Sequence, residues 1–117
     1  MLVSLLKSKI HRATITEADL DYVGSLTVDR DLMDAVDLMP FEEILVANIT
    51  NGERFVTYVI EGERGTGVIG LNGAAARKGR VGDLVIVLAF AQMEKHEAAS
   101  FKPAIVVVDK DNKPTSA

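Results

Sequence analysis

The sequence predicts a mainly β protein: a closed or nearly closed small barrel of about six or seven short strands with one or two short helices. The apolar residues make up 48% of the chain and are mostly Val, Ile, Leu and Ala, which favours strands with small side chains. Several segments alternate between apolar and polar residues, as half-buried strands do. So many short strands would leave unpaired edges unless the sheet closes on itself.

The first part of the chain is expected to form two strands joined by a turn. Residues 8–16 alternate, so a strand would place Lys9, His11, Ala13 and Ile15 on one face and Ile10, Arg12, Thr14 and Thr16 on the other. A turn is expected over residues 17–21, and residues 25–29 have the pattern of a second strand. On ordinary residue usage, the Gly24-Ser25 pair between them is also a turn.

A helix is expected next, over residues 29–40. Apolar side chains recur there at helical spacing, with Asp29 or Asp31 as the N-terminal cap and Pro40 as the stop. The later elements, in chain order, are a short strand at 68–72, a loop or one helical turn at 73–83, a buried strand at 84–91, a helical turn at 93–100, a last strand at 104–109 and a fraying polar tail at 110–117.

A β-hairpin within residues 42–60 is the clearest element. Asn51-Gly52 separates two alternating runs, which is the strongest short-range hairpin signal. The second arm would place Arg54 and Tyr58 on one face and Thr57 on the other.

Composition argues against several classes of function. A net charge of −4, with no basic cluster beyond residues 76–80, argues against nucleic-acid binding. The absence of cysteine removes disulfides and thiol nucleophiles, and two histidines are too few for a multi-histidine metal site within one chain. The apolar run at 84–91 is too short for a membrane span, and residues 1–12 lack a signal-peptide cleavage site. We therefore expect a cytoplasmic protein with no metal, nucleic-acid or membrane partner.

Four polar residues on two predicted strands form the first candidate site. Lys9, Arg54, Thr57 and Tyr58 supply two cations and two hydroxyls. Two cations in one pocket would suit an acidic substrate, because an arginine can bind a carboxylate through two hydrogen bonds. The alternative is that the two cations are solvated surface residues, as Lys and Arg usually are.

The segment NGAAAR at 72–77 is a second candidate. Gly73, Ala74 and Ala75 leave the main chain uncovered, so a ligand could accept hydrogen bonds from backbone N–H groups. The alternative is an ordinary helical turn whose start is marked by the glycine. His11 is a further candidate because its environment can tune an imidazole, against the alternative of a structural histidine.

Four segments taken together resemble one known family. They are KIHRATITEADLDYVGS at 9–25, TNGERFVTY at 50–58, LNGAAAR at 71–77 and VGDLVIV at 81–87. In this order and spacing they are similar to the pyruvoyl-dependent aspartate 1-decarboxylases, over residues 1–93. The resemblance implies a double-psi β-barrel, a homotetramer and a lyase that makes its own cofactor.

The resemblance also implies a zymogen that cleaves itself between Gly24 and Ser25. Residues 1–24 would become the small β chain, and residues 25–117 the large α chain beginning with a pyruvoyl group made from Ser25. The Ser25 hydroxyl attacks the Gly24 carbonyl, and elimination of the resulting ester leads to the ketone. Glycine has no side chain to block this attack, and a hydroxyl such as that of Thr57 would suit as an oxyanion donor.

The implied reaction is the decarboxylation of L-aspartate to β-alanine and CO2, which supplies pantothenate biosynthesis. The ketone made from Ser25 would form a Schiff base with the substrate amine and accept the electrons that CO2 leaves behind. Tyr58 would donate the proton, and Lys9 and Arg54 would face the carboxylates. The other implied site members are Thr57, Asn72, Gly73, Ala74 and Ala75, with Tyr22 and His11 as further ones.

Two other interpretations stay open at this point. One is a non-catalytic β-barrel binding module in which Gly24-Ser25 is only a turn. The other is a decarboxylase for another acidic amino acid, such as glutamate. The residues also leave open whether a maturation factor assists cleavage and which site residues come from a neighbouring subunit.

Overall fold

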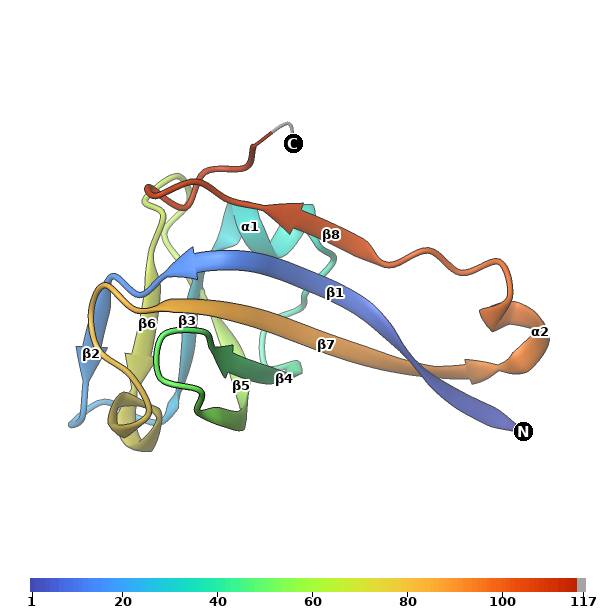
Figure 1. Cartoon of the computed structure of the whole chain (residues 1–117), viewed down its shortest axis with the longest axis horizontal. Helices are drawn as coiled ribbons and strands as arrows, with labels where there is room; N and C mark the ends of the chain where they lie inside the picture. Colours follow the sequence, from blue (N-terminus) through green and yellow to red (C-terminus); the bar gives the residue numbers. More distant parts are fainter. Residues whose placement is uncertain (116–117) are drawn as a thin grey trace.

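One continuous sheet of eight strands forms the body of the protein, which is consistent with a small β-barrel (Figure 1). The structure is a computed structural model, and it describes residues 1–115. The strands are β1 (Leu2–Thr14), β2 (Glu17–Asp19), β3 (Ser25–Asp29), β4 (Glu43–Asn48), β5 (Arg54–Gly62), β6 (Ile69–Asn72), β7 (Leu84–Glu94) and β8 (Ala104–Val107). The helices are α1 (Arg30–Ala35), the 3₁₀ helix η1 (Gly73–Arg77) and α2 (Lys95–Ala98). The predicted mainly β fold class is confirmed.

The order of strands in the sheet is β2-β6-β3-β5-β4-β7-β1-β8. Strand β3 pairs with β5 in parallel and with β6 in an antiparallel fashion, so the start of β3 lies between two strands. The predicted hairpin is confirmed: β4 and β5 are antiparallel, and Gly52 has the positive φ of 80° that the turn requires.

The predicted turn over residues 17–21 is wrong in part, because Glu17–Asp19 form β2 and pair in parallel with β6. All three side chains of β2 are exposed, so the apolar alternation that marks a strand is missing. The tertiary structure supplies what the local sequence lacks, namely a neighbouring strand with free backbone groups. With β2 included, the sheet has eight strands, compared with the six or seven that were predicted.

The strict alternation predicted for residues 8–16 is also wrong. The register of β1 against β7 shifts between Ile10 and Ala13, and Arg12 has a positive φ of 65°. Such a bulge inserts extra residues on one strand and reverses the facing of those that follow. Ile10 and Ala13, which were expected on opposite faces, are therefore both fully buried.

Helix α1 begins where it was predicted to begin and ends earlier. Asp29 is its cap, because its side chain accepts a hydrogen bond from the Asp31 backbone N–H at 2.8 Å. The helix ends at Ala35, and Asp37 has a left-handed φ of 59°. A residue in this conformation just beyond the end is a common helix terminator, so the chain leaves the helix before Pro40.

The polar tail predicted to fray is ordered as far as the structure describes it. Asn112 is 1% exposed, and its side-chain NH2 donates to the carbonyls of Thr14 at 2.8 Å and Gly67 at 2.7 Å. Its side-chain oxygen accepts from the Thr14 N–H at 2.8 Å. The tail thus joins the end of β1 to the turn before β6. Residues 116–117 lie outside the described part.

Strand β7 was predicted to be buried throughout, and this is wrong. Its side chains alternate: Val85, Val87 and Ala89 lie in the core, whereas Phe90 is exposed.

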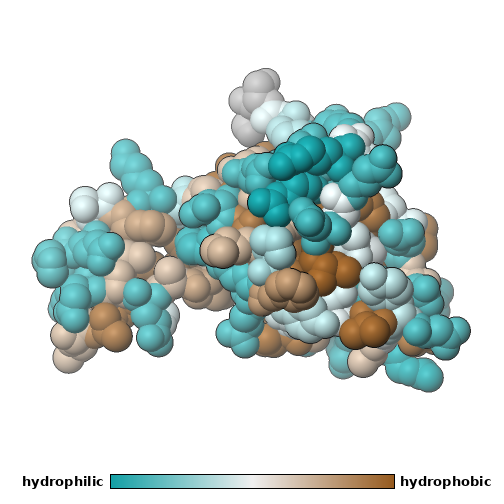
Figure 2. Space-filling view, turned by 180° about the vertical axis from the view of Figure 1, so that it is seen from behind, coloured by the Kyte–Doolittle hydropathy of each residue, from teal (hydrophilic) through white to brown (hydrophobic). Residues whose placement is uncertain are grey.

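Beyond the body, β1 and β7 continue as a paired arm that carries α2 at its far end (Figure 1). Apolar residues also reach the surface of the body (Figure 2). Within residues 1–115 no helix has the length and apolar character of a membrane span.

Candidate active site

Ser25 is the first residue of β3 and is held by a residue of the neighbouring strand. Its side chain is buried, and it pairs across the antiparallel ladder with Asn72, the last residue of β6. The Asn72 side-chain amide donates to the Ser25 hydroxyl oxygen at 3.0 Å and to the Thr27 hydroxyl oxygen at 2.7 Å. Because Asn72 is itself buried, this amide fixes the Ser25 hydroxyl in one position.

The peptide before Ser25 lies directly against the start of η1. Gly73 has a positive φ of 62°, and a Cβ atom there would lie 2.7 Å from the Gly24 Cα and 2.8 Å from the Tyr22 carbonyl oxygen. Only glycine fits such a close approach. Gly24 differs, because an added Cβ would meet only the Asn72 carbonyl oxygen at 3.8 Å. The folded chain therefore has room for a side chain at position 24.

A pocket of about 190 Å³ opens beside this peptide. One wall comes from β5 and the other from η1 and the residue that follows it. The lining residues are Gly24, Ser25, Phe55, Val56, Thr57, Ala74, Ala75 and Lys78. Of the residues expected in the site, Gly24, Ser25, Thr57, Ala74 and Ala75 thus line one pocket. Asn72 and Gly73 support it through the contacts described above.

The remaining expected residues do not line this pocket. Tyr58 follows Thr57 on the opposite face of β5, and its ring lies 6.2 Å from the ring of Phe41, centroid to centroid. Arg54 is exposed at the start of β5, and Tyr22 is also exposed. Lys9 lies on β1, which β4 and β7 separate from β5 in the sheet. In a single chain, these side chains therefore do not line the pocket beside Ser25.

His11 lies on the bulged part of β1, close to two cations. Burial lowers the pKa of its imidazole, and the charges of Lys9 and Arg12 lower it further, so the neutral ring is favoured. Within residues 1–115, the buried Nδ1 atom of His11 has no hydrogen-bond partner.

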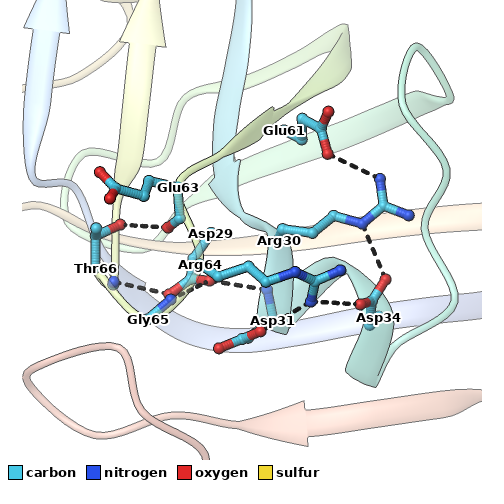
Figure 3. A network of polar contacts seen from close by, with 10 residues as sticks. Asp29, Arg30, Asp31, Asp34, Glu61, Glu63, Arg64, Gly65 and Thr66 are labelled. Carbon is cyan, nitrogen blue, oxygen red and sulfur yellow. Dashed lines mark hydrogen bonds and ion pairs between the residues drawn. The ribbon is translucent and has the colours of Figure 1, made fainter.

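The far end of β3 is anchored by Asp29 (Figure 3). One oxygen of this buried carboxylate accepts from the backbone N–H groups of Asp31 and Gly65, at 2.8 and 3.1 Å, and the other from Gly67 at 2.8 Å. Burial by itself raises the pKa of Asp29, but these N–H groups outweigh it and hold the pKa below its usual value. The strand that begins at Ser25 is thus fixed at both ends.

The comparisons with known proteins agree on one family. The family described as aspartate decarboxylase matches residues 1–115. An aspartate 1-decarboxylase from Acetivibrio thermocellus is 56% identical over 113 residues, which cover 97% of this chain and 90% of that protein. One from Albidiferax ferrireducens is 57% identical over 113 residues, covering 97% of this chain and 84% of that protein. The chain belongs to the aspartate decarboxylase family.

For this member of the aspartate decarboxylase family, sequence reasoning missed several residues of the site. Thr27, which shares the Asn72 amide with Ser25, lies two residues along the same strand face and could have been found from strand alternation. Phe55 and Val56 lie within the matched segment at 50–58 but were given no role, and Lys78 lies outside the matched segments. No sequence signal placed Lys78, because its position depends on how η1 packs against β5.

Proposed function

We propose that the chain cleaves itself between Gly24 and Ser25, and that residues 25–117 then decarboxylate L-aspartate to β-alanine and CO2. The observation that carries the proposal is the buried Ser25 hydroxyl, which Asn72 holds at 3.0 Å in a pocket shared with Gly24 and Thr57. Membership of the aspartate decarboxylase family supports both the reaction and the substrate.

Cleavage uses groups of the chain itself. The Ser25 oxygen bonds to the Gly24 carbonyl carbon, the Thr57 hydroxyl donates to the oxyanion that forms, and the peptide C–N bond breaks to leave an ester. Loss of the Ser25 α-proton then expels the Gly24 carboxylate and leaves a dehydroalanine. Water converts this residue to a pyruvoyl group and releases ammonia. The atoms balance with water as the only added reactant.

The space around position 24 supports this role. The folded chain would accept a side chain there, so neither packing nor backbone conformation explains the glycine. An attacking hydroxyl does explain it, because a side chain next to the carbonyl would hinder the approach and the strained geometry it needs. At position 73, by contrast, packing does explain the glycine, because an added Cβ atom would lie too close to Gly24.

Several residues would serve the decarboxylation. The pyruvoyl group supplies an electrophilic ketone and an electron sink for the α-carbon when CO2 leaves. Phe55 and Val56 on β5, with Ala74 and Ala75 on η1, make the pocket mainly apolar, which weakens the hydration of the departing carboxylate. Thr57 and the backbone of residues 73–75 would bind the substrate, and Tyr58 would return a proton to the α-carbon.

The proposal includes assembly. Lys9, Arg54, Tyr58 and His11 lie outside the pocket of a single chain, and a homotetramer would bring such residues to Ser25 from a neighbouring subunit. The exposed apolar side chains of the body, among them Val56 and Phe90, support an association of this kind. We also propose that the enzyme acts in the cytoplasm and supplies β-alanine for pantothenate.

Mass spectrometry of the denatured protein tests the cleavage. We expect two fragments, residues 1–24 and 25–117, with the larger one lacking the serine amine and gaining mass on borohydride treatment because its ketone is reduced. An unbroken chain that nevertheless releases CO2 from aspartate would contradict the proposal.

A comparison of aspartate with glutamate tests the substrate. Glutamate carries one more methylene than aspartate, and a site shaped for one amino acid discriminates against such an addition. We expect CO2 release from aspartate to exceed that from glutamate by at least about tenfold in kcat/KM. Equal values would contradict the choice of aspartate.

A further inference from the structure

Lys78 is the one charged residue among those that line the pocket beside Ser25. Lys78 lies between the matched family segments at 71–77 and 81–87, and neither assigns a function to it. A dicarboxylate carries two negative charges, and Lys78 is the cation that the same chain places at this pocket, whereas Lys9 and Arg54 would have to come from a neighbouring subunit. We propose that the Lys78 ammonium binds the carboxylate that the substrate keeps, and so determines substrate affinity. This inference rests on the proposed decarboxylation of aspartate.

The main chain of Lys78 is firmly held at the end of η1. Its backbone N–H donates to the Ala75 carbonyl at 3.0 Å. Its carbonyl accepts from the side-chain amides of Asn48 at 3.3 Å and Asn51 at 3.0 Å, both near the β4–β5 turn. The main chain of residue 78 is thus held against the β4–β5 turn, whereas its long side chain can change direction.

The Lys78 ammonium has a resting partner that it can exchange. Its Nζ lies 3.0 Å from a carboxylate oxygen of Glu53, with the two side chains 45% and 48% exposed. Ion pairs as exposed as this one are weak. A substrate carboxylate that enters the less hydrated pocket offers Lys78 a stronger interaction, in competition with Glu53.

The chemistry decides which substrate carboxylate Lys78 should bind. A cation on the α-carboxylate would stabilise the charge that is lost when CO2 leaves, and would slow the reaction. A cation on the side-chain carboxylate contacts the ground state and the transition state alike, so it lowers KM and leaves kcat unchanged. The second arrangement is the one compatible with catalysis.

Steady-state kinetics of two variants test the proposal through the sign of their effects. Lys78→Met removes the cation, so KM for aspartate should rise by about tenfold to a hundredfold with little change in kcat, as expected for the loss of a charge-assisted hydrogen bond. Glu53→Gln removes the competing carboxylate, so KM should fall. If the Lys78–Glu53 ion pair has only a structural role, both variants lose the same pair and should change KM in the same direction. That result would overturn the proposal.

Two further variants control for net charge and for shape. Arg77→Met removes a neighbouring exposed cation on η1 that does not line the pocket, and KM should stay close to that of the unmodified enzyme. Lys78→Arg should recover most of the affinity because it restores a cation. Denaturing mass spectrometry of each variant shows whether the chain has been cleaved, and thermal melting shows whether it is folded.

Binding of succinate, measured by calorimetry, separates this inference from the proposed function. Succinate has two carboxylates and no amine, so it probes the pocket without reaction. We expect the Kd to be lowest for Glu53→Gln, intermediate for the unmodified protein and highest for Lys78→Met. This order in a protein that does not decarboxylate aspartate would overturn the function and retain the carboxylate site. Equal Kd values, or no binding to the unmodified protein, would overturn the role of Lys78 even in an active enzyme.

Discussion

Two regions that hold parts of the same expected site differ in how complete they are. Around the Gly24-Ser25 bond, one chain brings together the hydroxyl, the Asn72 amide that holds it and the close backbone of Gly73. By contrast, Lys9, His11, Arg54 and Tyr58 are spread over β1 and β5, outside that pocket. This difference underlies our proposal that bond cleavage uses one folded chain, whereas decarboxylation also uses groups that assembly supplies.

Substitution of Ser25 should have the largest effect. Ser25→Ala removes the attacking oxygen, so we expect neither cleavage nor decarboxylation, measured by denaturing mass spectrometry and CO2 release. Ser8→Ala is a matched control, because Ser8 is also fully buried and hydrogen-bonded, to the Val36 carbonyl at 2.5 Å, but does not line the pocket. It should lower stability and still cleave. Normal CO2 release by Ser25→Ala would contradict the role of this residue.

Tyr58→Phe should separate the two regions. The variant keeps every contact around Gly24-Ser25, so we expect normal cleavage, but kcat should fall by about a hundredfold to ten-thousandfold because a proton donor is lost. Phe41→Leu removes the neighbouring ring and keeps the Tyr58 hydroxyl, so it should retain most of the activity. Unchanged kcat in Tyr58→Phe would remove this residue from the donor role.

Gly73→Ala should slow cleavage without abolishing it, unlike Ser25→Ala. The new methyl group would lie 2.7 Å from the Gly24 Cα, and the positive φ of 62° disfavours any side chain by about 1–2 kcal/mol. We expect the first-order rate of fragment formation to fall by at least about tenfold, since 1.4 kcal/mol corresponds to that factor. Gly82→Ala tests strain without contact, because Gly82 has a φ of 96° and no atom within 4 Å of an added Cβ. Equal rates in both variants would show that the contact with Gly24 has no effect.

The smallest expected effect concerns the far end of β3. Asp29→Asn weakens hydrogen bonds from three backbone N–H groups, and should lower the free energy of unfolding at neutral pH by about 1.5–3 kcal/mol. The pKa of Asp29 is lower in the folded state, so its contribution is complete above the unfolded value of 3.8 and is lost as the pH falls through the folded value.

Urea denaturation between neutral and acidic pH measures this contribution. The unmodified protein should lose stability in that acidic range, and the variant should show a flatter dependence on pH. Asp34→Asn is the control, because Asp34 pairs with Arg30 and Arg64 at the surface and should change stability little. Identical pH profiles for the unmodified protein and Asp29→Asn would show that the carboxylate charge does not contribute.

Local patterns were sufficient to predict much of the fold and part of the site. The Asn51-Gly52 hairpin and the Asp29 cap were found because each depends on residues a few positions apart. Ser25, Thr57, Ala74 and Ala75, which the family resemblance implies as site members, line one pocket, and their roles there stay predictions. Their actual proximity rests on the pairing of β3 with β5 and β6.

By itself the sequence determined the mainly β class and the hairpin, because these follow from backbone preference and residue type, whereas the chemistry expected at Gly24-Ser25 came from the family resemblance. Only the tertiary structure decided that β2 is a strand, that Asn112 is buried and that Lys78 lines the pocket beside Ser25 whereas Lys9 does not. Each of these depends on groups brought together from distant parts of the chain. No local pattern specifies such contacts, since the partner that satisfies a backbone group or a charge is chosen only when the sheet forms.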